Sequence, residues 1–104
     1  MLSLNGGNIE NNTREKTIVL FRADWSPNSR EFKPEFDSYD CRVRVKLAEA
    51  VINEEENQLW GMYKIKEVPT IIAFEKGKEI GRVNGKRQTG LLNKDMDSLL
   101  KMIA

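Results

Sequence analysis

The chain contains no histidine and only one cysteine, Cys41. The absence of histidine excludes Ser–His and Cys–His catalysis and removes the commonest zinc ligand. A single cysteine cannot form an internal disulfide bond. We expect Cys41 to be an incidental thiol rather than a reactive one, and we expect no metal ion and no cofactor.

The sequence also lacks an excess of either charge. Seventeen basic residues stand against sixteen acidic ones, for a formal net charge of +1. This balance disfavours a surface dedicated to nucleic acid or to anionic membranes. No apolar run approaches the length of a membrane span, and the N-terminus lacks the basic and apolar blocks of a signal peptide. We therefore expect a cytoplasmic protein with no nucleic-acid or membrane partner.

The 104 residues fit one small domain with a single core. Residues 1–16 are polar and rich in asparagine and glycine, which predicts a loose arm or a short strand and turn. Beyond them, the pattern predicts strands over residues 17–23, 46–52, 70–74 and 79–83, and helices over residues 28–39, 58–64 and 91–103. This order predicts an α/β fold, in which a central mixed sheet is flanked by helices and the chain ends in a hairpin and a C-terminal helix. We expect a monomer.

Helical spacing indicates which side chains face the core. The residues expected to point inward are Phe32, Phe36, Tyr39, Leu59, Met62, Tyr63, Leu92, Met96, Leu99, Leu100 and Ile103.

The turn after the first long strand carries the most informative residues, Trp25 to Arg30. Ser26 is a natural N-cap, and Pro27 suits the first position of the helix. Pro34 is expected to kink this helix because it has no N–H to donate. Trp25 has little core to fill at a turn, so we favour a surface role over packing for it.

The family resemblance rests on these residues and on three later groups. The run from Val19 to Trp25 looks like the strand that leads into the active site of the thioredoxins, and Arg30 and Pro34 match the residues that follow. Val68, Pro69 and Thr70 match the family's cis-proline loop. Phe74, Gly77 and Gly85 match its hairpin and the glycine beyond it. Over residues 17–104 the chain therefore resembles the thioredoxin family.

The resemblance implies thiol–disulfide exchange with protein substrates as the parent activity, with thioredoxin reductase as a candidate partner. Ser26 would stand for the attacking thiol and Ser29 for the resolving thiol. A groove for an extended peptide would be lined by Trp25, Pro27, Asn28, Val68, Pro69 and Gly85. A cis bond at Pro69 would leave the backbone of Val68 free to pair with that peptide.

Two departures from the family's pattern bear on activity. Ser26 and Ser29 stand where the family has its redox cysteines, and Leu20 stands where many members carry a buried acid. A serine hydroxyl is not ionised near neutral pH and cannot form a disulfide, so we predict no thiol–disulfide activity for this chain.

Two explanations of the serines are left open. In one, the natural protein has cysteine at both positions and the serines were introduced to silence it. In the other, the serines are natural and the domain is a redox-inert module that binds peptides or proteins. A structural subunit of a larger assembly is a weaker third possibility.

Two charged segments are expected to be solvated surface without a ligand. Glu54, Glu55 and Glu56 are consecutive and cannot easily converge on one metal ion, so we expect a solvated acidic loop. The basic side chains of Lys76, Lys78, Lys86 and Arg87 are expected to form a solvated hairpin face.

Overall fold

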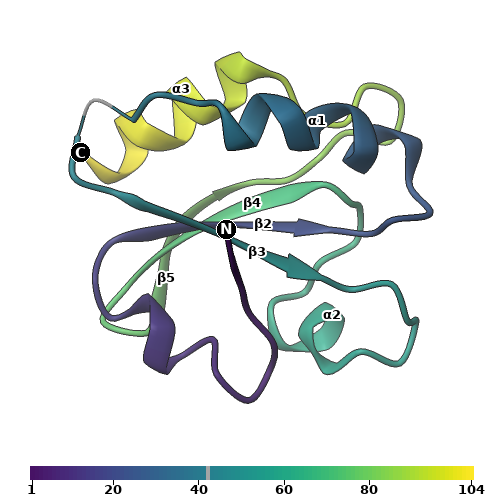
Figure 1. Cartoon of the computed structure of the whole chain (residues 1–104), viewed down its shortest axis with the longest axis horizontal. Coiled ribbons are helices and arrows are strands. Elements are labelled where there is room, and N and C mark those ends of the chain that lie inside the picture. Colours follow the sequence, from purple (N-terminus) through teal and green to yellow (C-terminus); the bar gives the residue numbers. More distant parts are fainter. Residues whose placement is uncertain (42) are drawn as a thin grey trace.

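A computed structural model describes residues 1–41 and 43–104. Its five-stranded sheet has the order β1-β3-β2-β4-β5 (Figure 1). The strands are β1 (Leu2–Ser3), β2 (Thr17–Arg22), β3 (Lys46–Val51), β4 (Thr70–Glu75) and β5 (Lys78–Val83). The helices are α1 (Pro27–Asp37), α2 (Gln58–Met62) and α3 (Asn93–Ile103), and a 3-10 turn spans Asn11–Thr13. The predicted α/β fold, with its mixed sheet, terminal hairpin and C-terminal helix, is confirmed.

Strand β2 lies at the centre of the sheet. It pairs in parallel with β3 and antiparallel with β4. Its residues from Thr17 to Phe21 are all buried, as expected for a β-branched and apolar run covered on both faces. The parallel crossover through α1 and the antiparallel β4–β5 hairpin account for the mixed character of the sheet.

The helices divide between the two faces of the sheet. Helices α1 and α3 cover one face, while α2 and the N-terminal segment lie on the other (Figure 1). The first face is filled by Phe32 and Phe36 of α1 and by Met96 and Leu99 of α3. The second face has its own apolar cluster around Phe21 and Phe74, so the sheet is sandwiched between two cores.

The N-terminal segment takes the more ordered of its two expected forms, a short strand followed by turns. Strand β1 pairs in parallel with β3 at the edge of the sheet. Leu4 and Ile9 are buried in the second core, and the hydroxyl of Thr13 donates to the carbonyl oxygen of Ile9 at 2.7 Å. Two apolar anchors in sixteen residues are enough to hold a polar segment against the sheet.

Two of the side chains expected to point inward are exposed instead. Met62 is 51% exposed, because α2 has only five residues and places Leu59 and Tyr63, which are four residues apart, against the sheet. Leu92 is 45% exposed, because it is the extended N-cap residue of α3 and lies outside the helical repeat. Leu91 is buried next to it. The expectation was wrong for both residues.

The hairpin between β4 and β5 turns through two residues. Lys76 and Gly77 both have positive φ angles, 57° and 78°. This is the conformation that matches the twist of two antiparallel strands, and glycine favours it. Among the described residues, no helix is long and apolar enough to cross a membrane.

The buried position of Ile9 predicts that the N-terminal segment contributes to stability. Replacing Ile9 by alanine should lower the free energy of unfolding by about 2–4 kcal/mol, because it leaves a cavity in the second core. The control Leu2→Ala removes an exposed side chain from the same segment and should cost less than about 0.5 kcal/mol. Urea unfolding followed by circular dichroism measures both. Equal, small effects would show that the segment does not pack as described.

Candidate functional site

The turn between β2 and α1 has the geometry of a capped helix start. Ser26 is extended and its Oγ accepts a hydrogen bond from the backbone N–H of Ser29 at 3.2 Å. Pro27 follows at the first helical position, where its missing N–H costs nothing. The Oγ of Ser29 is fully buried and accepts from the N–H of Ala23 at 3.2 Å. The predicted N-cap at Ser26 is confirmed.

A hydrogen bond joins this turn to the segment before β4. The hydroxyl of Ser26 donates to the carbonyl oxygen of Val68 at 3.2 Å, and Ser26 is only 5% exposed. The peptide bond between Val68 and Pro69 is cis. The hydroxyl of Ser26 therefore occupies one of the two acceptor positions of the Val68 carbonyl oxygen.

Two glycines allow the loop after β5 to approach Pro69 and the start of α1 closely. A Cβ atom built on Gly85 would lie 1.9 Å from the carbonyl oxygen of Pro69, and the Gly85 N–H donates to Thr70 Oγ1 at 3.2 Å. A Cβ on Gly90 would lie 2.8 Å from the Cβ of Asn28. Only glycine permits these close approaches, so the loop over residues 84–90 is held against both Pro69 and α1.

The structure brings most of the predicted site residues together. Asn28 Nδ2 donates to the carbonyl oxygen of Arg87 at 3.2 Å, which links the start of α1 to the same loop. Gly90 was missed by the sequence reasoning. Its positive φ of 65° cannot be read from the sequence. The only sequence signal for Gly90 was a glycine in a loop just before a helix.

Trp25 lies on the surface beside this turn. It is 58% exposed, and its indole N–H donates to the carbonyl oxygen of Asn53 at 2.9 Å. The ring is therefore held in place by the loop after β3 rather than by the core. Pro27 is also exposed, so these two residues present the solvent-facing side of the turn.

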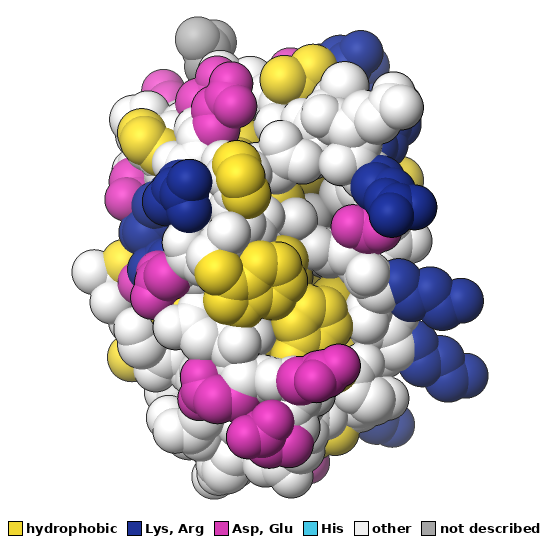
Figure 2. Space-filling view, turned by 90° about the vertical axis from the view of Figure 1, so that its right-hand side faces the viewer, with side chains coloured by type: hydrophobic (Ala, Val, Ile, Leu, Met, Phe, Trp, Pro, Cys, Tyr) yellow, Lys and Arg dark blue, Asp and Glu magenta, His cyan; other side chains and the backbone are white. Residues whose placement is uncertain are grey.

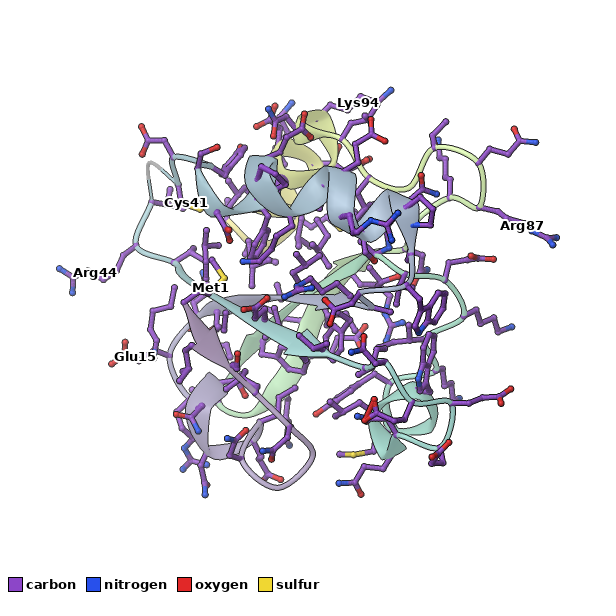
Figure 3. All side chains as sticks on the ribbon, turned by 45° about the vertical axis from the view of Figure 1, so that its right-hand side comes forward. Met1, Glu15, Cys41, Arg44, Arg87 and Lys94 are labelled. Carbon is purple, nitrogen blue, oxygen red and sulfur yellow. The ribbon has the colours of Figure 1, made fainter. Side chains whose placement is uncertain are left out.

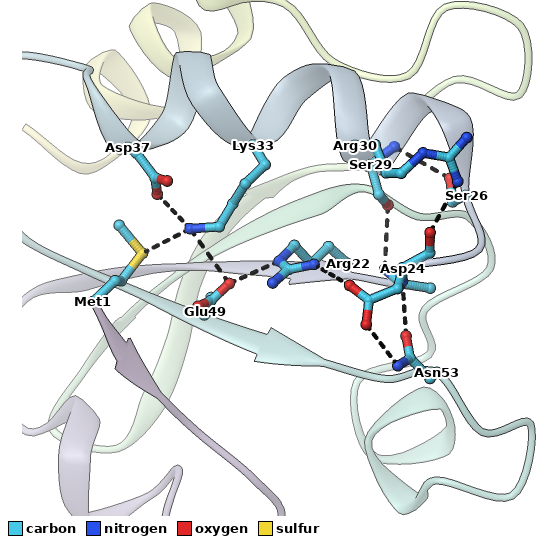
Figure 4. A network of polar contacts seen from close by, with 11 residues as sticks. Met1, Arg22, Asp24, Ser26, Ser29, Arg30, Lys33, Asp37, Glu49 and Asn53 are labelled. Atoms are coloured by element: carbon cyan, nitrogen blue, oxygen red, sulfur yellow. Dashed lines mark hydrogen bonds and ion pairs between the residues drawn. The ribbon is translucent and has the colours of Figure 1, made fainter.

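A network of charged side chains fixes the strand that leads into the turn (Figure 4). Arg22 Nε lies 2.7 Å from Glu49 Oε1 on β3, and Lys33 Nζ of α1 lies 3.5 Å from the same oxygen. Arg22 also pairs with Asp24 at 2.7 Å. The network thus ties β2, β3 and α1 together immediately behind the site.

The same contacts set the charge state of this region. Burial alone would lower the pKa of Arg22, but its hydrogen bonds to Glu49 and Asp24 outweigh burial and raise it. The hydrogen bond from Asn53, and then the one from Arg22, lower the pKa of the Asp24 carboxyl. Both groups are therefore charged at neutral pH and serve as fixed structural charges.

Cys41 lies far from the candidate site. It follows the C-terminal end of α1, whereas Ser26 caps the N-terminal end, and eleven helical residues between them span about 16 Å. Figure 3 shows Cys41 and Arg87, whose carbonyl contacts Asn28, on opposite sides of the molecule. Cys41 cannot substitute for a thiol at position 26. The described residues contain no group of three potential metal ligands.

The contact between Gly85 and Pro69 predicts a strong response to a single methyl group. Gly85→Ala should lower the free energy of unfolding by about 2 kcal/mol or more, because backbone must move to accept the Cβ. Gly61→Ala is the matched control. Nothing lies within 4 Å of a Cβ at Gly61 in α2, so alanine should stabilise the protein by about 0.5–1 kcal/mol. Thermal unfolding of the two variants should move in opposite directions, and a neutral Gly85→Ala would contradict the described packing.

The environment of Cys41 predicts slow alkylation. Burial raises the pKa of its thiol above the ordinary value, and the carboxylate of Asp40 raises it further. Since only the thiolate reacts, the rate with iodoacetamide at pH 8 should be lower than that of a free cysteine, and it should keep rising above about pH 9. Mass spectrometry of samples quenched over a pH series measures this rate. A plateau reached below pH 8 would contradict the shift.

The sequence is similar to a known protein family and to individual proteins. A family model described as Thioredoxin matches residues 7–98. Thioredoxin of Mycoplasma pneumoniae is 33% identical over 73 residues, which cover 70% of this chain and 72% of that protein. Thioredoxin of Chlamydia caviae is 29% identical over 86 residues, with 83% and 78% covered.

Solved structures show the same fold at lower identity. Thioredoxin f2 of Chlamydomonas reinhardtii superposes with a TM-score of 0.77 at 19% identity and covers 99% of this chain and 93% of its own. A mutant thioredoxin of Halobacterium salinarum gives a TM-score of 0.74 at 20% identity, with 99% and 90% covered. From the family match and the relatives together, the chain belongs to the thioredoxin family.

Proposed function

We propose that this chain binds extended segments of partner proteins in a groove and performs no disulfide exchange. The groove, called the peptide groove below, is formed by Trp25, Pro27, Asn28, the Val68–Pro69 segment and Gly85. Members of the thioredoxin family generally act on protein substrates and with reductases through thiol–disulfide oxidoreduction. In this proposal the chain still binds proteins as other family members do, but it does not catalyse the exchange.

The observation that carries the proposal is the hydrogen bond between Ser26 and Val68. It places the hydroxyl of Ser26 beside the backbone that precedes the buried Pro69. An extended peptide that lies along this segment would pair with backbone groups there. A carbonyl oxygen has two lone pairs, so that of Val68 can accept from a peptide N–H as well as from the hydroxyl of Ser26.

The redox-inert part of the proposal follows from oxygen chemistry. Exchange requires a thiolate that attacks a disulfide sulfur and a second thiol that resolves the mixed disulfide. Ser26 and Ser29 offer hydroxyl groups that are engaged with backbone partners. The helix N-terminus, which would lower the pKa of a thiol, does not ionise a hydroxyl at neutral pH.

A disabled oxidoreductase is the second candidate function. In that case the peptide groove serves to hold a protein disulfide, and a cysteine pair at positions 26 and 29 would supply the missing chemistry. The buried hydroxyl of Ser29 and the nearly buried hydroxyl of Ser26, three residues apart at a helix start, favour this possibility. We further propose that the protein acts as a cytoplasmic monomer.

Binding is tested with the carboxymethylated B chain of insulin, which is unfolded and cannot exchange disulfides. Tryptophan fluorescence should report saturable binding, and Trp25→Ala should weaken it about tenfold, because an exposed aromatic anchor is lost. Met102→Ala on α3 removes a side chain of the same 58% exposure and should leave the affinity unchanged. The absence of saturable binding to the wild-type chain would overturn the proposed function.

The two explanations of the serines predict different behaviour for the double variant S26C/S29C. We expect this variant to reduce insulin with dithiothreitol as electron source, because the capped helix start would hold both sulfurs in the positions of the hydroxyls. The wild-type chain and S26C alone should show only the uncatalysed rate. A double variant that folds and forms the 26–29 disulfide but does not reduce insulin would favour a dedicated binding module.

A further inference from the structure

A hollow lies beside Trp25, at one edge of the proposed peptide groove. Trp25, Asn53, Glu55 and Trp60 line a cavity of about 440 Å³. The four residues come from the turn after β2, the loop after β3 and helix α2. Figure 2 shows apolar side chains at the centre of this end of the molecule, with acidic side chains gathered along its lower edge.

The same loop fixes both tryptophans of the chain. The indole N–H of Trp25 donates to the carbonyl of Asn53 at 2.9 Å, and that of Trp60 donates to the carbonyl of Glu54 at 3.0 Å. Because the two N–H groups are already engaged, the rings offer the cavity their apolar and π-electron surfaces. Ring positions held by hydrogen bonds reduce the entropy lost when a ligand binds between them.

The charge around the cavity is negative. Glu54, Glu55 and Glu56 are all exposed, and none of the ion pairs found among residues 1–41 and 43–104 involves them. Asp24 is nearby in the chain, and Arg22 offsets its charge. Arg30 donates to the backbone carbonyl of Asp24 and adds one positive charge. The three carboxylates of the acidic loop outnumber this cation, so the balance at this site is negative.

We propose that this cavity binds a basic side chain, best an arginine, of the peptide held in the peptide groove. A guanidinium group stacks on indole faces and forms paired hydrogen bonds with a carboxylate such as that of Glu55. Trp25 borders both the groove and the cavity, so one extended peptide can reach both. This inference rests on the proposed function and narrows its ligands to segments with a basic residue.

The test compares two peptides that differ in one group. A ten-residue peptide with one central arginine is titrated against the same peptide with citrulline, which is neutral and has nearly the same shape. The chain has only two tryptophans, so two indole N–H signals in a ¹H–¹⁵N spectrum report directly on the cavity. The arginine peptide should shift both signals and bind about five to ten times more tightly than the citrulline peptide.

Two variants separate the aromatic and the acidic contributions. Trp60→Leu and Glu55→Gln should each reduce the preference for the arginine peptide over the citrulline peptide to less than about twofold. The control Glu15→Gln removes an equal charge from the opposite end of β2, and Figure 3 shows Glu15 on the side away from Arg87. It should leave the preference intact.

The binding results distinguish failure of the basic side-chain site from failure of the proposed function. If both peptides bind the wild-type chain equally, the basic side-chain site is wrong and the peptide groove stands. If the preference is lost in Glu55→Gln but kept in Trp60→Leu, simple charge attraction replaces the proposed cavity. If neither peptide binds, the proposed function fails and the inference fails with it.

Discussion

The pairing of β2 with both of its neighbours is the constraint on which the site depends. Phe21 of β2 lies opposite Thr70 of β4, so the segment just before Thr70 must lie beside the residues just after Phe21. This register brings Val68 and Pro69 next to the turn at Ser26, and their hydrogen bond follows from it. A slip of either neighbour by one residue would move its side chains to the opposite face of the sheet, where they would no longer fit the core that they now fill.

Buried charge near the site has a structural role in this protein. Leu20 is fully buried and apolar, and its partner in the β2–β3 register is Glu49. The carboxylate of Glu49 is neutralised by Arg22 and Lys33, which offsets the cost of its burial and joins two strands to α1.

At the start of α1, the shape of the side chains at positions 26 and 29 can be kept while their reactivity is lost. Replacing sulfur by oxygen preserves a small, hydrogen-bonding side chain at the N-cap, but it removes the ionisable nucleophile. The close contacts of Gly85 and Gly90 with Pro69 and Asn28 do not involve the side chains at positions 26 and 29. In the function proposed above, the domain recognises protein segments without disulfide chemistry, and the basic side-chain site proposed at the tryptophan cavity would make that recognition selective.

The sequence by itself determined the elements, their order and the capped turn, because these depend on local patterns of apolar residues, on proline and on serine. It also placed Ser26, Ser29, Val68 and Pro69 in one site through their likeness to a family. Only the tertiary structure decided the rest. The exposure of Met62 and Leu92, the contact of Gly90 with Asn28 and the cavity between Trp25 and Trp60 depend on where separate segments meet, and no periodicity within one segment encodes that meeting.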